Sequence, residues 1–288
     1  MEFTTENMIR FKNLIYSRTY LSFSRWREDL LRSWILQRAG AVHSRSLDGY
    51  YQLLSSDEKE FEQLIALITT RNTYFFRMPG HFQALSEIVL PEIVEREGAK
   101  VLHARSGREP QRMRLRVWSA GCATGQEPYS LSIQILDAIR YAKAWNIKVL
   151  GTDINADALA VAEAGRYSVT GIGKMPAQFI ERYFEVSGLE EISLSKEVRG
   201  ITEFRTLNLR NLTDRIEFKN AFDIIFCRNV MIYFDQPAQQ RLIAALWEAL
   251  VPGGYLFTGE GEVLRLTSHD LEVKEWRGNI FYRRTEGK

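Results

Sequence analysis

A glycine-containing loop and the carboxylate at its end could together bind a small organic ligand. The stretch SAGCATGQEPYS, residues 119–130, contains Gly121 and Gly125, and Glu127 stands immediately before a proline. Glycines allow the backbone to turn tightly and allow a ligand to approach it closely. A carboxylate in this loop would repel a pyrophosphate, and it would suit a cationic or hydroxyl-bearing ligand.

The glycine spacing excludes two common phosphate-binding motifs for this loop. Gly121 and Gly125 form a G-x-x-x-G pattern, which is neither the G-x-G-x-x-G of dinucleotide sites nor a Gly-Lys-Ser/Thr phosphate loop. The alternative for Glu127 is a purely structural one, in which its charge stabilises the positive end of the following helix. Both interpretations remain open at this point.

A second carboxylate, Asp153, follows another apolar run in the stretch GTDIN. An acidic residue at the end of a strand can accept hydrogen bonds from a ribose diol, as in other nucleotide-binding sheets. Asp153 could instead cap the next helix, although Asn155 or Asp157 could serve that purpose. The residues alone leave both interpretations of Asp153 open.

The stretch FDIIFCRNVMIYF, residues 222–234, has the composition of a buried strand that ends in polar chemistry. Its apolar first half is followed by Arg228, Asn229 and Tyr233. An asparagine amide can both donate and accept hydrogen bonds, so it suits a binding site. The alternative for Tyr233 is a surface aromatic residue that lies over the following helix.

These candidate residues all follow strands of one predicted sheet. Strand-like and helix-like runs alternate from about residue 115, which predicts a mostly parallel sheet with helices on both faces. The stretch VKEWRGNIFYRR predicts a terminal antiparallel hairpin. In open sheets of this kind, ligands bind outside the carboxyl ends of the strands. We therefore expect the candidate residues to meet at that edge.

The domain organisation follows from the same patterns. Residues 1–80 have apolar residues at helical spacing and no strand-like alternation, so we expect a small helical domain. Residues 81–288 would form the sheet domain, with a polar, exposed connection at 96–114. An inserted antiparallel β-subdomain is expected at about 183–206, because the apolar residues there alternate over a short distance.

Composition narrows the class of protein. The 288 residues are 45% hydrophobic and 26% charged, which is typical of a soluble globular protein. The apolar runs are too short to span a membrane, and the N-terminus is unlike a secretory signal, so we expect a cytoplasmic protein without membrane insertion. Two cysteines form no disulfide framework, and the four histidines show no metal-ligand spacing. The net charge of +2 does not favour nucleic-acid binding.

Basic residues are concentrated near the N-terminus. Residues 10–45 contain eight basic and two acidic side chains. Such an excess could attract an acidic partner, although a solvated helix face would have the same composition.

Taken together, the features favour an S-adenosylmethionine-dependent methyltransferase over a dehydrogenase. The loop lacks phosphate-binding chemistry, an acid follows the second strand, and the sheet ends in an antiparallel hairpin. Five stretches then carry a specific resemblance. In order, they are TTRNTYFFR, SAGCATGQEPYS, GTDIN, FCRNVMIYF and LVPGGYLFTGEGE. With these stretches the chain resembles the chemotaxis-receptor glutamate O-methyltransferases, the CheR-type family, from about residue 10 to its end.

The resemblance implies an α/β fold and a cofactor. The fold is a Rossmann-like methyltransferase domain with a small helical N-terminal domain and an inserted β-subdomain. The cofactor is S-adenosylmethionine, which leaves as S-adenosylhomocysteine. The residues that the resemblance assigns to cofactor binding are Thr73, Arg77, Glu127, Asp153, Asn208, Leu209, Asn229 and Val230.

The resemblance also implies the reaction and the acceptor. Arg77 would lie near the sulfonium and the acceptor, and Tyr233 would face the acceptor glutamate, so these two are the expected catalytic residues. The product would be a glutamyl methyl ester on a chemoreceptor. Two alternatives remain: a methyltransferase of the same fold that acts on another acceptor in a non-chemotactic signalling array, and a cofactor-binding scaffold without turnover.

Two departures from the family pattern bear on the partner. GEGE at 259–262 replaces the more common Gly-His-Ser-Glu, and the β-subdomain lacks the Gly-x-Gly that accompanies docking to a receptor's C-terminal tether. We therefore expect a tether-independent, monomeric enzyme. Its basic N-terminal helix, through Arg27, Arg32 and Arg38, would contact the helical bundle of the receptor directly.

Overall fold

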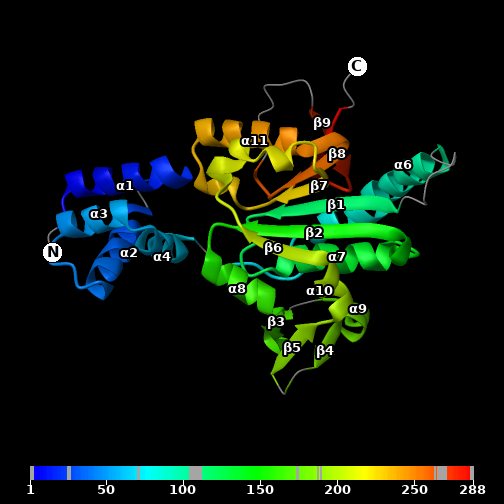
Figure 1. Cartoon of the computed structure of the whole chain (residues 1–288), viewed down its shortest axis with the longest axis horizontal. Coiled ribbons are helices and arrows are strands. Elements are labelled where there is room, and N and C mark those ends of the chain that lie inside the picture. Colours follow the sequence, from blue (N-terminus) through cyan, green and yellow to red (C-terminus); the bar gives the residue numbers. More distant parts are fainter. Residues whose placement is uncertain are drawn as a thin grey trace.

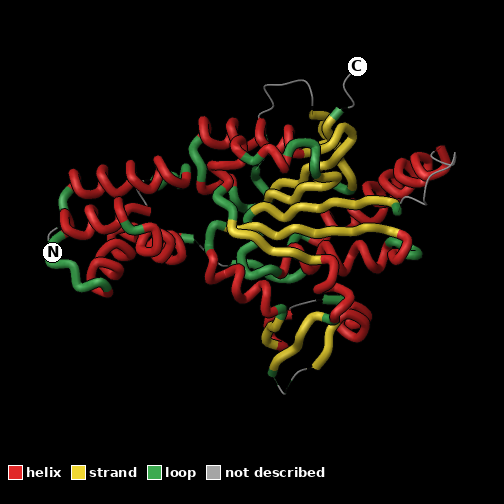
Figure 2. Tube along the Cα trace, in the orientation of Figure 1, coloured by secondary structure: helices red, strands yellow, loops and turns green. Residues whose placement is uncertain are grey.

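A computed structural model of the chain describes residues 3–24, 27–69, 72–103, 112–172, 175–186, 188, 190–262, 264 and 271–285. It has a helical N-terminal domain beside a larger α/β domain (Figure 1). Figure 2 shows the strands of the larger domain at its centre, with helices on both sides of them. The expected α/β class with a helical N-terminal domain is confirmed.

The N-terminal domain consists of four helices with a shared core. Side-chain caps begin three of them: Thr4 accepts from the Asn7 amide, Ser46 from the Gly49 amide, and Asp57 from the Glu60 amide. Apolar residues at helical spacing on all four helices form one buried cluster. The helices are α1 (Thr5–Thr19), α2 (Glu28–Ala41), α3 (Leu47–Ser56) and α4 (Glu58–Ile68).

One nearly continuous helical run connects the two domains and packs against the large sheet. It comprises α5 (Pro79–Ala84), the π-helical turn η2 (Leu85–Val89) and α6 (Leu90–His103). The expectation of an exposed connection at 96–114 is therefore wrong for residues 96–103, which are helical, and for residues 113–114, which begin strand β1 (Met113–Ala120), while 104–111 lie outside the described residues. The polar composition misled because this helix buries only one face, on which Glu97 pairs with Lys100.

The large sheet has seven strands in the order β6-β2-β1-β7-β8-β10-β9. The first five in this order are parallel, and β10 pairs antiparallel with β8 and β9 as the predicted terminal hairpin. Strand order reverses between β1 and β7, which is where such sheets bind ligands. The strands are β1 (Met113–Ala120), β2 (Trp145–Asp153), β6 (Thr202–Thr206), β7 (Phe222–Cys227), β8 (Leu250–Thr258), β9 (Leu271–Trp276) and β10 (Asn279–Arg284).

Each face of this sheet has its own hydrophobic core. Alternate residues of β1 show the division, since Val117 belongs to one core and Trp118 to the other. Helices α6 and α7 cover the first face and α11 covers the second. The remaining helices are α7 (Gln126–Ala138), α8 (Ala156–Ala164), α10 (Lys196–Ile201) and α11 (Gln236–Ala249), with short 3-10 turns at η3 (Ala142–Ala144), η4 (Val169–Ile172), η5 (Leu209–Asp214), η6 (Ile216–Phe218) and η7 (Met231–Tyr233).

A small antiparallel sheet projects from the larger domain below α7 and α8 in Figure 1. Its order is β3 (Arg166–Ser168), β5 (Glu191–Leu194) and β4 (Phe184–Val186), and α9 (Ala177–Tyr183) precedes β4. Compared with the expected range of 183–206, the structure adds β3 and gives Thr202–Thr206 to the large sheet as β6. The sequence does not indicate β3 because a strand of three residues is too short to show alternation. It does not separate β6 from the small sheet because an edge strand of either sheet has the same alternating pattern.

Candidate active site

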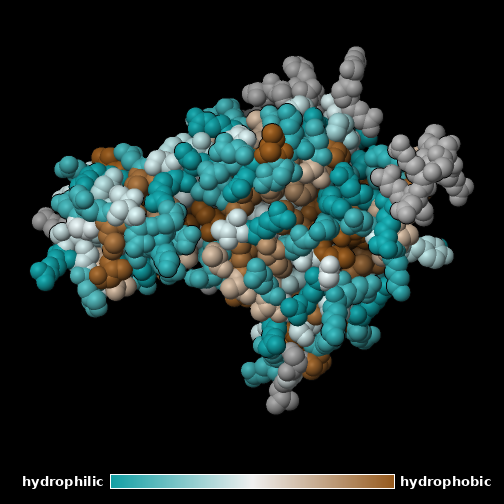
Figure 3. Space-filling view, viewed as in Figure 1, coloured by the Kyte–Doolittle hydropathy of each residue, from teal (hydrophilic) through white to brown (hydrophobic). Residues whose placement is uncertain are grey.

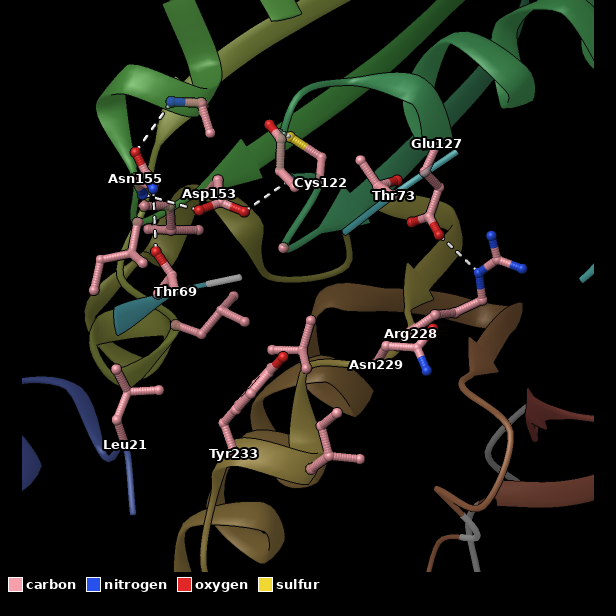
Figure 4. A pocket seen from close by; sticks show the side chains of 18 of the residues that line it. Leu21, Thr69, Thr73, Cys122, Glu127, Asp153, Asn155, Arg228, Asn229 and Tyr233 are labelled. Atoms are coloured by element: carbon pink, nitrogen blue, oxygen red, sulfur yellow. Dashed lines mark hydrogen bonds and ion pairs between the residues drawn. The ribbon is translucent and has the colours of Figure 1, made fainter. Parts of the chain in front are cut away.

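A cavity of about 420 Å³ lies at the carboxyl ends of β1, β2 and β7, against the helical domain. We call it the rim cavity, and Figure 4 shows the side chains around it. All nine residues that the sequence singled out line it: Thr73, Arg77, Glu127, Asp153, Asn208, Leu209, Asn229, Val230 and Tyr233. Residues of the helical domain, including Thr19 and Leu21, complete its wall. A cavity of this size suits a small-molecule ligand.

One position in the loop after β1, Gly121, has a backbone conformation and a close contact that only glycine allows. Gly121 has φ +81°, and a Cβ atom placed there would lie 2.4 Å from Val230 Cγ2. The loop is also held by the amides of Gly121 and Cys122, which donate to the Thr152 carbonyl at 2.8 and 2.9 Å. Gly121 therefore allows β1 and the loop after β7 to approach each other at the cavity.

Glu127 is held by an ion pair with Arg228. The Arg228 Nε atom donates to Glu127 Oε2 at 2.7 Å, and the Ser119 hydroxyl donates to Oε1 at 2.7 Å. The Arg228 side chain is 1% exposed and lies 5.1 Å from the ring centre of Phe226. Sequence reasoning gave Arg228 no role, because a charged residue at a strand tip gives no sign of what it pairs with.

Asp153 lines the rim cavity and is held there by backbone amides. Its Oδ2 accepts from the Ala123 amide at 2.8 Å, and its Oδ1 accepts from the Asn155 amide at 2.9 Å. Each carboxylate oxygen can accept a second hydrogen bond. Asn155, and not Asp153, caps α8 by accepting from the Ala158 amide at 3.0 Å. The capping alternative for Asp153 therefore fails, and a ribose remains a suitable partner.

Two asparagines connect the domains beside the cavity. Asn155 Nδ2 donates to Thr69 Oγ1 at 3.1 Å, and Asn208 Nδ2 donates to the Arg18 carbonyl at 2.7 Å. The Asn208 Oδ1 atom also accepts from the Arg210 amide at 3.1 Å. Because its amide is engaged within the protein, Asn208 can line an adenine site mainly by packing. Sequence reasoning recognised Asn155 as a possible cap and missed its contact with the helical domain.

The loop after β7 presents an unsatisfied acceptor and a phenol. Asn229 has φ +59°, and its Oδ1 atom is buried without a hydrogen-bond partner among the described residues. In Figure 4 the Tyr233 hydroxyl points into the space between Asp153 and Arg228. The Tyr233 carbonyl accepts from the Ser22 amide at 2.8 Å, so the helical domain supports this loop.

Arg77 approaches the cavity from the segment between α4 and α5. Its guanidinium donates to the Asn72 carbonyl at 3.2 Å and lies 5.8 Å from the Tyr74 ring centre. It forms no ion pair with any residue that the structure describes. The neighbouring Phe76 amide donates to Ser130 Oγ at 2.9 Å, which fixes the segment on α7. Arg77 is thus positioned to bind an anion.

The cavity offers neither a thiol nucleophile nor a metal site among the described residues. Burial, together with the charges of Asp153 and Glu127, raises the pKa of Cys122 well above its usual value, so the thiol stays protonated. Within the described ranges, no three His, Cys, Asp or Glu residues are grouped to hold a metal ion. The carboxylate, amide and arginine side chains that line the cavity suit a bound organic group.

Comparison with protein families decides what this group is. The model of the CheR methyltransferase SAM-binding domain matches residues 71–278, and that of the CheR methyltransferase all-alpha domain matches residues 6–69. The chain belongs to the CheR methyltransferase family. Its cofactor is S-adenosylmethionine, and its activity is that of a methyltransferase.

Similar proteins cover almost the whole chain. Chemotaxis protein methyltransferase 2 of Vibrio cholerae is 28% identical over 99% of this chain and 95% of the relative. The chemotaxis protein methyltransferase of Klebsiella aerogenes is 32% identical over 97% and 89%, respectively. Chemotaxis protein methyltransferase 1 of Pseudomonas aeruginosa is 33% identical over 77% of each chain. Among the described residues, no helix is both long and apolar enough to cross a membrane.

The residues around the rim cavity fit S-adenosylmethionine. The buried Asn229 Oδ1 atom, which has no hydrogen-bond partner among the described residues, is a ready acceptor for an ammonium or amino group. The Asp153 carboxylate lines the cavity with oxygens of the kind that accept from a diol, and Gly121 leaves room where any side chain would collide with Val230. Glu127 also lines the cavity, and its charge is compensated by the ion pair with Arg228.

Proposed function

We propose that this CheR-family enzyme transfers methyl groups to glutamate side chains of a chemoreceptor and forms glutamyl methyl esters. The observation that carries the proposal is Arg77, an arginine without an ion pair among the described residues, at a cavity whose other arginine, Arg228, is paired with Glu127. An acceptor carboxylate would complement that charge. The names of the relatives, chemotaxis protein methyltransferases, support a receptor as the substrate.

The cofactor would be held by residues from each strand end. Asp153 would accept from the ribose hydroxyls, while Asn208 and Leu209 would pack beside the adenine. Asn229, Val230 and Glu127 would line the methionyl part, and Thr73 would cover it. Each of these residues lines the rim cavity, which supports the roles that the resemblance implies.

The chemistry requires orientation more than activation. Bound S-adenosylmethionine supplies a methyl group that a sulfonium already activates, and a glutamate carboxylate is ionised at pH 7, so no general base is needed. Arg77 can orient the acceptor carboxylate through paired hydrogen bonds. Tyr233 can donate a directing hydrogen bond and exclude water. Alignment of this kind can contribute several kcal/mol, of the order of 7, to lowering the barrier.

The surface of the helical domain that contacts the receptor must include fewer basic residues than the local charge suggests. Arg38 pairs with the buried Glu60, so it cannot also bind a receptor, and the proposed contact of Arg38 is withdrawn. Arg10, Lys12 and Arg18 also pair within the helical domain. Arg32 is exposed on α2, and Arg27 lies at its start, 4.9 Å from the Tyr233 ring centre.

We therefore place the receptor contact at the start of α2. Much of the face shown in Figure 3 is hydrophilic, including most of the helical domain, which suits transient binding to an acidic helical bundle. Independence from a receptor tether, a monomeric state and a cytoplasmic location complete the proposal.

Transfer of a radiolabelled methyl group tests the function. The purified chain is incubated with methyl-labelled S-adenosylmethionine and candidate receptor fragments, and labelled methanol is measured after mild base. Base-labile methanol is expected because carboxyl esters hydrolyse readily. Base-stable label would favour a different acceptor atom. Cofactor binding without transfer to any receptor would favour the scaffold.

A further inference from the structure

A buried glutamate behind the rim cavity connects two turns of the backbone. The Glu262 Oε2 atom accepts from the amides of Asn229 and Gly259 at 2.8 and 2.7 Å, and Oε1 accepts from the Ile232 amide at 3.1 Å. The residue is 7% exposed. One carboxylate thus satisfies three backbone donors, two of which belong to the loop after β7.

The chain around Glu262 is shaped to bring the carboxylate to these donors. A Cβ atom on Gly259 would lie 2.5 Å from Glu262 Oε2 and 2.7 Å from the Asn229 nitrogen, so a side chain there would displace both. The Glu262 amide donates back to the Gly259 carbonyl at 3.0 Å, which closes the turn. The GEGE stretch is therefore built around the carboxylate of its last residue.

The loop that Glu262 holds contains two groups that line the rim cavity, Asn229 and Tyr233. Asn229 is in the left-handed region, with its Oδ1 atom unpartnered among the described residues, and Tyr233 ends the 3-10 turn that begins at Met231. Hydrogen bonds at Asn229 and Ile232 fix both ends of this short segment. Displacement by about 1 Å can reduce a rate about 100-fold.

We propose that Glu262 is a positioning residue for methyl transfer: its ionised carboxylate holds residues 229–232, and through them Tyr233, in the reactive arrangement. This inference rests on the proposed function for its acceptor, and on the family activity for its chemistry. Glu262 does not touch the rim cavity itself and acts only through the backbone it binds.

The surroundings of Glu262 make its charge sensitive to pH. Burial raises its pKa above the usual value, against the opposing effect of the backbone amides, and no ion pair to it occurs within the described residues. The Cys227 thiol faces it from β7 and stays protonated, because burial and the charges of Glu262 and Glu127 raise its pKa. From α11, the neutral amides Gln236 and Gln239 line the adjoining space.

The sign of the pH effect follows from these contacts. Protonation replaces one accepting oxygen by an O–H donor that faces backbone N–H groups, so the loop loses a bond as pH falls through the raised pKa. The acceptor carboxylate ionises near pH 4.3 when unperturbed. Loss of activity caused by Glu262 is therefore expected at a higher pH than loss caused by the acceptor.

The variant Glu262→Gln tests the proposal in the full-length chain. Either orientation of the new amide places an NH₂ group against at least one backbone N–H. At saturating cofactor, kcat should fall about 10- to 100-fold. The affinity for S-adenosylhomocysteine, measured by calorimetry, should fall by less than about 5-fold, since the main cofactor contacts proposed for Asp153 remain. Glu260→Gln, which makes the same change at an exposed residue of the same turn, should behave like the wild type.

Two further measurements distinguish a positioning role of Glu262 from an effect on folding. They also do not depend on which acceptor is methylated. The pH profile of kcat should lose its upper acid limb in Glu262→Gln, and amide exchange at Asn229 and Ile232 should become faster in that variant even without a receptor. Unchanged kcat and exchange would overturn the proposal, as would a fall in kcat that merely follows the folded fraction. If wild-type protein transfers no methyl to any receptor, the proposed function fails, while the exchange data still decide the role of Glu262.

Discussion

Arg228 and Glu127 form a buried ion pair that joins the end of β7 to the start of α7. The Nε–Oε2 distance is 2.7 Å, and Arg228 Nη1 also donates to the Arg77 carbonyl at 2.7 Å. A single guanidinium, from the loop that also carries Asn229, thereby contacts the start of α7 and the segment that carries Arg77. The pair fixes three parts of the rim cavity relative to one another.

Arg228→Met is expected to destabilise the protein by about 3–5 kcal/mol, because it leaves the Glu127 charge buried and unpaired. Urea unfolding measures this loss, and calorimetry should show weaker binding of S-adenosylhomocysteine. The double variant Arg228→Met/Glu127→Gln should recover much of the stability, since no uncompensated charge remains. Arg166→Met breaks an exposed pair with Glu191 and should cost less than about 1 kcal/mol. Equal effects of the two single variants would contradict the structural role.

Asp153→Ala is expected to weaken binding of S-adenosylhomocysteine about 10- to 100-fold, as a charged acceptor for the ribose is lost. Thermal unfolding should shift only modestly, because the Ala123 and Asn155 amides lose an acceptor next to a cavity that water can enter. Asp157→Ala, an exposed residue in the first turn of α8, is the matched control. Wild-type affinity in Asp153→Ala would remove Asp153 from the cofactor site.

The cavity lining could be predicted because strand ends converge in a parallel sheet. Glu127, Asp153 and Asn229 each follow a strand of the predicted α/β pattern, so topology alone brings them together. Their neighbours were harder to predict. Glu262 and Arg228 act through contacts between segments that are 33 and 101 residues apart in sequence, and no local pattern encodes those contacts.

The ion pairs of the helical domain also could not be predicted from the sequence. Arg38 occurs at a spacing that fits a solvated helix face, yet its guanidinium reaches Glu60 on α4, where Tyr50 also donates to the carboxylate at 2.9 Å. The amino-acid composition gives the number of charged residues, but it does not show which of them form ion pairs. The same limit explains the helix at 96–103, where the polar composition predicts an exposed connection although Glu97 is buried with its own partners.

Arg38→Glu is expected to unfold the helical domain and not to report receptor binding. It places two carboxylates together at a site where Glu60 is 6% exposed, with a cost of about 3–5 kcal/mol. Circular dichroism during urea titration measures this loss. Arg32→Glu, at an exposed position of α2, should leave stability unchanged and raise the KM for the receptor. A receptor KM that is unaffected by Arg32→Glu would exclude this part of α2 from the interface.

Stability should fall in mild acid because of His81. This residue is 3% exposed at the start of α5, with its ring centre 5.4 Å from that of Phe257. Burial, helped by the nearby positive charge of Arg228, lowers the pKa of His81 to about 4 from its ordinary 6.5. The unfolded chain therefore binds a proton at a higher pH than the folded chain does. Stability is fully present above about pH 6.5 and is lost as pH falls towards 4, by about 3 kcal/mol in total.

The variant His81→Leu isolates this contribution. Its unfolding free energy should depend less on pH than that of the wild type, so the difference between the two should change progressively from pH 7 to pH 4.5 in urea titrations. His43→Asn, at an exposed position with φ +53° that asparagine tolerates, should retain the wild-type slope. Parallel curves for wild type and His81→Leu would mean that His81 takes up its proton without unfolding. Since Arg228 lies beside His81, that outcome would also require the Arg228–Glu127 pair to tolerate a second buried cation.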